Sequence, residues 1–277
     1  MGVTARIDQR EALKLSSKLM DYLTEKGLSA FLDKRVAERI KNPYPTLPLN
    51  KMKTDLIITI GGDGTILRTC LEIPKPEPPI LSINMGVRGF LTEVHPKDAF
   101  KAIDKCLEGK FKIEKHTKLA SFIGKKRLPD ALNEVCIVSK APVKLLYLKV
   151  WRNGVLVGDC RSDGVIIASQ VGSTGYSLSA GGPVLDPQVE AFVLTPICPL
   201  SDFHPIVFSS NSSIAVELLK PEKAFVVIDG HYRTEAKADD RPIIIKESEF
   251  KSSFIRFEEN FYHRLKERTA FSRGREF

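Results

Sequence analysis

"DLIITIGGDGTILRTCLE", residues 55–72, places an apolar run directly before two glycines and a carboxylate. After its first residue the run at 55–60 is apolar except for Thr59, which is typical of a strand buried on both faces of a sheet. Helical spacing follows over 65–71, so the glycines stand between a predicted strand and a predicted helix. Open α/β sheets bind ligands at such turns, at the carboxyl ends of parallel strands.

The residues on either side of this stretch repeat the same order of strand and helix. The apolar patterns predict strands at 3–7, 29–32 and 78–84, and helices at 11–26 and 96–108. A Pro- and Asn-rich stretch at 41–53 predicts a loop. Alternation of this kind predicts an α/β fold with a doubly wound parallel sheet.

The character of the chain changes after about residue 109. Strand-like stretches then follow one another, and "RNGVL" at 152–156 has Asn-Gly between apolar runs, a strong hairpin signal. Helical spacing returns in the tail at 259–271. We therefore expect an α/β domain at 1–108 and 255–277, with the tail packing back on it, and a β-rich domain at 109–254.

The composition indicates a globular protein with a basic surface. The formal net charge is +8, which could be a solvated surface or could attract anionic small molecules or nucleic acid. Nucleic acid is the weaker alternative, because zinc-finger spacing and RNP-like aromatic motifs are missing from the sequence.

Cysteine usage and hydropathy bear on the compartment. The five cysteines are odd in number and none forms a C-x-x-C pair, which argues against a disulfide framework and a zinc site. No apolar run approaches the ~20 residues of a membrane span, and the early charges are unlike a signal peptide. We predict a cytoplasmic protein that binds neither membrane nor nucleic acid.

The turn at 61–65 is the first candidate for chemistry. Gly-rich turns after strands usually receive phosphate, so the anionic Asp63 either only shapes the turn or performs chemistry that a cation could not. Thr65 could cap the helix or bind a phosphate oxygen. The turn fits neither the Walker A pattern nor the dinucleotide fingerprint G-x-G-x-x-G.

Two further stretches carry candidate polar groups. Gly86 and Gly89 follow the strand predicted at 78–84, so a second Gly-rich turn should lie at the same sheet edge, with Phe90 lining a crevice. A plain loop before core residues is the alternative. Asn133 and Glu134, at a strand start, could bind ribose hydroxyls or could simply form a turn.

The stretch at 161–187 is dense in Gly, Ser and Thr. Its hydroxyl groups could bind a polar ligand, and the ring of Tyr176 could stack on a flat base. A mobile linker is the alternative, disfavoured by the apolar strands on both sides. Asp229-Gly230 ends a predicted strand and indicates a hairpin. The five histidines are scattered, none at i,i+4 from another, so no metal-binding box is predicted.

Taken in order, these stretches resemble the NAD kinase family along essentially the whole chain. The family signatures are a GGDGT turn, a G-x-x-GFL segment, an NE dipeptide and a loop of the form DG…GSTAYSLSAGGP. Here they stand at 61–65, 86–91, 133–134 and 163–183. The chain departs from the family at Gly175, where Ala is frequent, and at His231, where Gln is common.

The resemblance implies transfer of the terminal phosphoryl group of ATP, or of polyphosphate, to the 2′-hydroxyl of the adenosine ribose of NAD, giving NADP. It implies Asp63 as the general base and a divalent cation, Mg²⁺ or Mn²⁺, that arrives with the phosphoryl donor. It also implies a homodimer or homotetramer. The residues expected to bind substrate or nucleotide are Gly62, Gly64, Thr65, Arg68, Phe90, Asn133, Glu134, Lys144, Arg161, Asp163, Thr174, Gly175, Tyr176, Ser177, Leu178, Ser179 and His231.

Two rival functions remain open from the residues. Diacylglycerol-type lipid kinases and phosphofructokinases share the GGD turn, so a lipid or sugar kinase is one alternative. A non-catalytic sensor that binds NAD is the other, and in it Asp63 would perform no chemistry.

Overall fold

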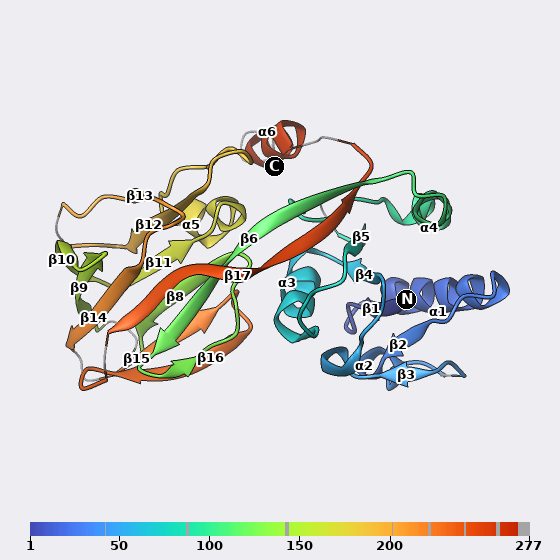
Figure 1. The fold of residues 1–277 in the computed structure, drawn as a ribbon, viewed down its shortest axis with the longest axis horizontal. Helices are drawn as coiled ribbons and strands as arrows, with labels where there is room; N and C mark the ends of the chain where they lie inside the picture. Colours follow the sequence, from blue (N-terminus) through green and yellow to red (C-terminus); the bar gives the residue numbers. More distant parts are fainter. Residues whose placement is uncertain are drawn as a thin grey trace, which may run out of the picture. The chain divides into compact units, whose positions relative to one another are not determined.

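The computed structural model describes residues 1–41, 43–86, 89–141, 144–200, 202–220, 223–240, 242–258 and 261–270. For residues 267–270 it describes the backbone only. Val87 and Arg88, inside the second predicted Gly-rich turn, lie outside the described residues, as does the end of the predicted tail helix at 271. The chain divides into two compact units (Figure 1). One unit is Met1–Lys115 with Ser252–Phe277, and the other is His116–Lys251.

A parallel sheet forms the centre of the first unit. Its strands lie in the order β5-β4-β1-β2-β3 and all pair in parallel. The end of the long strand β17 joins β5, also in parallel, at Phe254. The bounds are β1 (Gly2–Ala5), β2 (Phe31–Asp33), β3 (Thr46–Leu47), β4 (Ile57–Gly61), β5 (Ile80–Asn84) and β17 (Ile243–Arg256). The predicted parallel sheet is confirmed.

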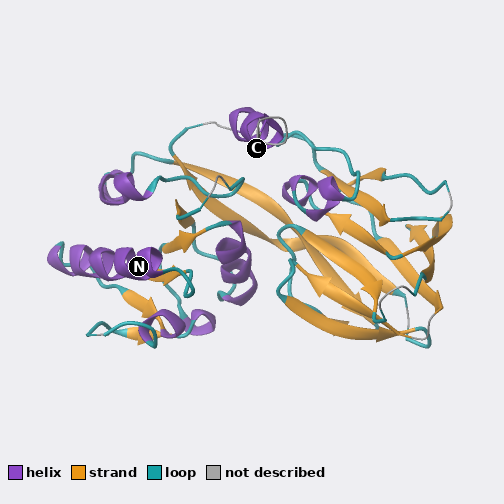
Figure 2. Cartoon of the chain, turned by 180° about the vertical axis from the view of Figure 1, so that it is seen from behind, coloured by secondary structure: helices purple, strands orange, loops and turns teal. Residues whose placement is uncertain are grey.

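Helices cover both faces of this sheet, as a doubly wound fold requires (Figure 1, Figure 2). Alternate strand residues such as Ile58 and Ile60 pack with α1 and α4 in one core. The helix predicted at 11–26 is α1, and its residues Ala12, Leu19 and Leu23 are fully buried. On the other face lie α3 and η1. The bounds are α1 (Arg10–Glu25), α2 (Lys34–Ala37), η1 (Leu49–Lys51), α3 (Asp63–Glu72), η2 (Pro96–Asp98) and α4 (Ala99–Leu107).

Two local expectations differ from the structure. The predicted loop at 41–53 holds the two-residue strand β3 and the helical turn η1. A strand of two residues is too short to show apolar alternation in the sequence. Its extended conformation is therefore decided by its pairing with β2, and the local sequence gives no signal for it. The short helix α2 was also not predicted. Its N-cap is Asp33, whose side chain accepts a hydrogen bond from the N–H of Arg35.

Strands dominate the second unit, as predicted, and they pair antiparallel. Six of them form a sheet in the order β13-β12-β11-β8-β15-β16, with bounds β8 (Glu134–Ser139), β11 (Gly164–Ala168), β12 (Ala191–Ile197), β13 (Ile206–Ser209), β15 (Lys223–Ile228) and β16 (Tyr232–Lys237). The remaining strands are β6 (Lys112–Ile123), β7 (Lys126–Arg127), β9 (Leu146–Arg152), β10 (Val155–Ser162) and β14 (Ile214–Lys220). β14 pairs with β9 and with β17.

Both predicted hairpins form. Asn153 and Gly154 join β9 to β10 with φ values of 50° and 82°, the two positive angles that a type I′ turn requires. Asp229, Gly230 and His231 join β15 to β16, and the first two have φ values of 47° and 67°. In both turns the short residues tolerate a left-handed backbone that most side chains avoid.

The predicted tail helix is α6 (Phe261–Ala270), and it packs on the first unit as expected. Arg264 donates a hydrogen bond to the carbonyl of Phe90, and the rings of Phe90 and Phe261 lie 5.9 Å apart. Across the described part of the chain, the helices are all too short or too polar to traverse a lipid bilayer.

Candidate active site

The Gly-rich turn of the first unit joins the end of β4 to the start of α3. A Cβ on Gly61 would lie 2.2 Å from Oγ1 of Thr65, so the strand can end here only with glycine. The N-cap of α3 is Gly62, and no side chain caps this helix. The expectation that Thr65 caps the helix is therefore wrong, because the helix begins at Asp63 and Thr65 is already inside it.

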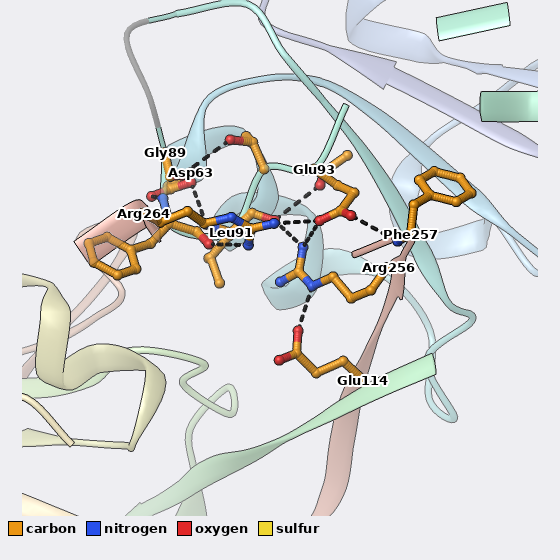
Figure 3. Close-up of polar contacts among 11 residues, drawn as sticks. Asp63, Gly89, Leu91, Glu93, Glu114, Arg256, Phe257 and Arg264 are labelled. Atoms are coloured by element: carbon orange, nitrogen blue, oxygen red, sulfur yellow. Dashed lines mark hydrogen bonds and ion pairs between the residues drawn. The ribbon is translucent and has the colours of Figure 1, made fainter. Parts of the chain in front are cut away.

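Asp63 is held by the second Gly-rich segment. Its Oδ2 accepts a hydrogen bond from the N–H of Phe90 over 2.8 Å, and its Oδ1 accepts one from Leu91 over 3.0 Å (Figure 3). A Cβ on Gly89 would lie 2.2 Å from Oδ1, so only glycine lets the segment approach the carboxylate. Each carboxylate oxygen has two lone pairs, so with respect to the described residues both oxygens can accept one more hydrogen bond.

The two Gly-rich turns lie at one edge of the sheet, as predicted. β4 and β5 pair in parallel up to Gly61 and Asn84, and the N–H of Met85 donates to the carbonyl of Gly61 over 2.9 Å. Both strands therefore end at the same level. The carboxylate of Asp63 is thus presented where α/β sheets bind ligands.

A buried ionic cluster of Glu93, Arg256 and Arg264 supports the segment that holds Asp63. Arg264 donates to Glu93 and to the carbonyl of Phe90, and Arg256 donates to Glu93 and to the carbonyl of Leu91 (Figure 3). Arg256 also donates to Glu114. The side chain of Glu93 is only 2% exposed, and those of Arg256 and Arg264 are 8% and 15% exposed. Sequence reasoning missed all three, because their partners lie far away along the chain.

Arg68 lies on α3, one turn beyond Thr65. Its Nε and Nη2 are buried and have no hydrogen-bond partner among the described residues. Burial lowers the pKa of Arg68, and the neighbouring cation of Arg35 lowers it further. A guanidinium with unused donors suits a phosphate, which it can bind in bidentate fashion. Its predicted contact with phosphate stays a prediction.

In the second unit, Asp229 fixes the backbone around Asn133 and Glu134. Its Oδ1 accepts hydrogen bonds from the N–H groups of these two residues over 2.8 and 2.9 Å, and its Oδ2 accepts one from Leu132 over 2.7 Å. Asp229 is only 2% exposed, and burial raises its pKa. The sequence indicated only a hairpin at this position. A carboxylate directly before a turn glycine was the available signal.

The loop rich in Gly, Ser and Thr packs against the Asn133–Glu134 backbone. It forms η3 (Val171–Thr174) and α5 (Tyr176–Ser179), and a Cβ on Gly172 would lie 2.0 Å from the carbonyl oxygen of Asn133. A Cβ on Gly175 would lie 3.1 Å from Oε2 of Glu134 and 3.2 Å from Nδ2 of Asn133. The loop is therefore a packed element and not a linker.

Open hydrogen-bonding groups and an exposed ring lie together here. Oδ1 of Asn133 and Oε2 of Glu134 are buried without a hydrogen-bond partner among the described residues. Tyr176 is 46% exposed as a residue. Such an arrangement suits a ligand with hydroxyl groups and a flat base, because buried polar atoms are normally satisfied.

The other predicted residues lie in several settings. The hydroxyl of Thr174 donates to the carbonyl of Val171, and that of Ser177 is hydrogen-bonded to Thr195. Nδ1 of His231 lies 2.7 Å from the carbonyl oxygen of Asp229. Leu178 is half-buried, whereas the exposed members are Lys144 before β9, Arg161 over the ring of Tyr147, Asp163 after β10, and Ser179 in α5.

Glu134 gives a prediction on pH. Burial, and to a lesser extent the nearby carboxylate of Asp229, raise the pKa of Glu134 from 4.5 to about 8, although a hydrogen bond from the backbone of Tyr176 acts in the opposite direction. The folded state therefore holds a proton that the unfolded chain releases above pH 4.5, so the free energy of unfolding falls as pH rises from 4.5 to 8. We expect Glu134→Gln to remove this loss of unfolding free energy, which reaches roughly 5 kcal/mol at 1.36 kcal/mol per pKa unit.

Urea unfolding at pH 5 and pH 8.5 tests the predicted pH dependence of the free energy of unfolding. The free energy of unfolding of Glu134→Gln should exceed that of the wild type by more at the higher pH. Glu190→Gln replaces an exposed carboxylate of the same unit and should differ from the wild type equally at both pH values. A Glu134→Gln difference that does not change with pH would contradict the prediction.

Among the described residues, no group of three or more His, Cys, Asp and Glu side chains could hold a metal ion. The N–H groups of Phe90 and Leu91 surround Asp63, and N–H groups do not bind cations. The two N–H groups fix the orientation of the Asp63 carboxylate.

Comparison with known proteins supplies the family. The chain matches the model of the ATP-NAD kinase N-terminal domain over residues 1–111 and that of the C-terminal domain over residues 132–257. It is 42% identical to the NAD kinase of Methanothermobacter thermautotrophicus over 275 residues, which cover 97% of this chain and 95% of that relative.

Solved structures agree with the predicted fold. A crystal structure of an NAD kinase from Archaeoglobus fulgidus in complex with ATP is 31% identical, with a TM-score of 0.80 over 96% of this chain and 98% of that one. Yeast NADH kinase complexed with NADH has a TM-score of 0.89 at 24% identity, over 100% of this chain and 88% of that one. The second likeness concerns the fold alone.

Proposed function

Since the chain belongs to the NAD kinase family, we propose that Asp63 is the general base with which it phosphorylates NAD. The chain is a phosphotransferase that makes NADP with ATP as the donor, and the lipid or sugar kinase and the sensor are not favoured. The observation that carries the role of Asp63 is its carboxylate, which two N–H groups hold at the end of β4 while, among the described residues, each oxygen keeps a lone pair that no hydrogen bond uses.

The acceptor in this proposal is the 2′-hydroxyl of the adenosine ribose. As its oxygen attacks the terminal phosphorus of ATP, the bond from phosphorus to the bridging oxygen breaks and ADP leaves. The hydroxyl proton passes to a carboxylate oxygen of Asp63. A positioned carboxylate within hydrogen-bond reach accelerates such a step by ~10²- to 10⁴-fold.

Asn133 and Glu134 hold the ribose of NAD in this proposal, and residues 109–254 form the NAD-binding domain. Their unpartnered oxygens suit ribose hydroxyls, and the exposed ring of Tyr176 suits an adenine face. The loop that packs on them adds further contacts. The members of this loop are Thr174, Gly175, Ser177, Leu178 and Ser179. Asp163 after β10 and His231 between β15 and β16 add contacts, and Lys144 and Arg161 are two cations for the pyrophosphate.

The turn before α3 binds the phosphates of ATP in this proposal. The N–H groups of Gly62 and Gly64 stand at the start of a ten-residue helix, where backbone donors favour anions. Arg68 and Thr65 lie on the same helix, and Phe90 lies beside it. A divalent cation bound by the nucleotide lowers the repulsion between the phosphates and Asp63.

A homodimer or homotetramer in the cytoplasm completes the proposal. These two points follow the expectation from the family. Static light scattering of the purified protein measures the first of them.

The activity is tested by incubating the protein with NAD, ATP and Mg²⁺ and detecting NADP with an NADP-specific dehydrogenase. We expect NADP to form. Parallel reactions offer a diacylglycerol, a sphingoid base or a sugar phosphate as the acceptor, and polyphosphate as the donor. Faster phosphorylation of another acceptor, or silence with every donor, would refute the function.

A further inference from the structure

The peptide group between Phe90 and Leu91 lies between a cation and a carboxylate. Its N–H, which belongs to Leu91, donates to Oδ1 of Asp63 over 3.0 Å. Its carbonyl, which belongs to Phe90, accepts a hydrogen bond from Nη1 of Arg264 over 2.9 Å (Figure 3). One amide group therefore joins the guanidinium of the tail helix to the carboxylate that ends the Gly-rich turn.

Such an arrangement makes each hydrogen bond stronger than it would be alone. A cation on the carbonyl oxygen draws electron density from the amide nitrogen, so the N–H becomes a better donor to the carboxylate. Hydrogen bonds in a chain polarise one another in this way, and those with a charged partner are the strong ones. The orientation of Asp63 thus depends on where Arg264 lies.

Arg264 is itself fixed in place. It donates to Glu93, whose side chain is 2% exposed, and its own side chain is 15% exposed. The ring of Phe261, on the same helix, lies against Phe90 with centroids 5.9 Å apart. The tail helix therefore holds the segment by a guanidinium and by an aromatic ring.

We propose that Arg264 is a positioning residue for phosphoryl transfer, which orients the Asp63 carboxylate through the Phe90–Leu91 peptide group. The proposal rests on the assignment of Asp63 as the base. It makes the C-terminal helix α6 part of the catalytic apparatus. Arg264 acts through the peptide and not on the reacting atoms, so its loss lowers kcat and leaves the KM for NAD nearly unchanged.

Arg256 provides a matched comparison. It too is a buried arginine that donates to Glu93. It donates to the carbonyl of Leu91 over 2.9 Å, and that carbonyl belongs to the next peptide group, whose N–H is not one of the two that reach Asp63. A purely structural role predicts equal catalytic effects for the two arginines, whereas the peptide relay predicts unequal ones.

The test compares Arg264→Met, Arg264→Lys and Arg256→Met with the wild type, in kcat, in the KM for NAD and in melting temperature. We expect Arg264→Met to lower kcat by about 10²-fold, the cost of a small misplacement of a catalytic group, with the KM within about twofold. Arg264→Lys keeps the charge but not both hydrogen bonds, so its kcat should be intermediate. Arg256→Met should lose at least as much thermal stability with a smaller loss of kcat.

A second readout needs no activity. In protein labelled with ¹⁵N-leucine, the amide proton of Leu91 should move upfield in Arg264→Met, because its hydrogen bond to Asp63 weakens. Equal kcat losses in the two arginine variants, or an unmoved Leu91 resonance, would overturn the inference. Should Arg264→Met fail to fold, Arg264→Lys carries the same comparison.

Failure of the proposed function gives a different result. If Asp63→Asn formed NADP at the full wild-type rate, the assignment of Asp63 as the general base would be refuted, whatever the rates of the arginine variants. An inactive Asp63→Asn together with a fully active Arg264→Met would refute the positioning role alone.

Discussion

Asp63→Asn is expected to form NADP ~10³-fold or more slowly than the wild type, while its dissociation constant for NAD stays nearly the same. The amide cannot take the hydroxyl proton, and removal of a general base costs ~10²- to 10⁴-fold. A second loss adds to this one. The Asn oxygen can accept only one of the two N–H bonds of Phe90 and Leu91, because its NH₂ group would face the other donor.

Initial rates of NADP formation at saturating NAD and ATP measure this effect, and calorimetry measures NAD binding. Asp98→Asn is the control, since this carboxylate is exposed and does not cap the helix that it precedes. It should keep the wild-type rate. A folded Asp63→Asn within tenfold of the wild-type rate would show that another group takes the proton.

Local sequence patterns predicted most of the architecture. The apolar run before Gly61, the helical spacing of α1 and the Asn-Gly of the β9–β10 hairpin each encode their structure within a few residues. β3 shows the limit of this approach, because two residues carry no periodicity and the neighbouring strand supplies the hydrogen bonds. The error at Thr65 has a similar cause, since the helix begins two residues earlier than its apolar spacing indicates.

The missed parts of the site depend on contacts between residues that are distant in sequence. Asp229 accepts a hydrogen bond from the N–H of Asn133, 96 residues before it in the sequence. Arg264 donates one to the carbonyl of Phe90, 174 residues before it. A single sequence shows a carboxylate before a glycine or an arginine in a tail, but not the donor or acceptor that each one meets. The residues that could touch ligands were named from motifs, whereas those that orient them became visible only in the fold.

Asp229→Asn is expected to raise the dissociation constant for NAD by about 10- to 100-fold. Its oxygen can keep the N–H groups of Asn133 and Glu134 that Oδ1 now accepts, but its NH₂ would face the N–H of Leu132. Leaving that buried donor unpaired costs about 1–3 kcal/mol of the free energy of unfolding. The shift of the Leu132 backbone also moves Glu134 out of line with NAD. Loss of the hydrogen bond between Glu134 and NAD costs ~1.5–3 kcal/mol of binding free energy, which corresponds to the expected rise in the dissociation constant.

Asparagine is the right replacement, because Asp229 has a φ of 47° and Asn tolerates that backbone, so the turn itself survives. Calorimetry gives the dissociation constant and urea unfolding the stability. Asp239→Asn removes an exposed carboxylate of the same unit and should change neither quantity. Wild-type affinity in a folded Asp229→Asn would mean that the η3–α5 loop holds Asn133 and Glu134 without the carboxylate. The packing of Gly172 against Asn133 would then be the dominant constraint on the NAD site.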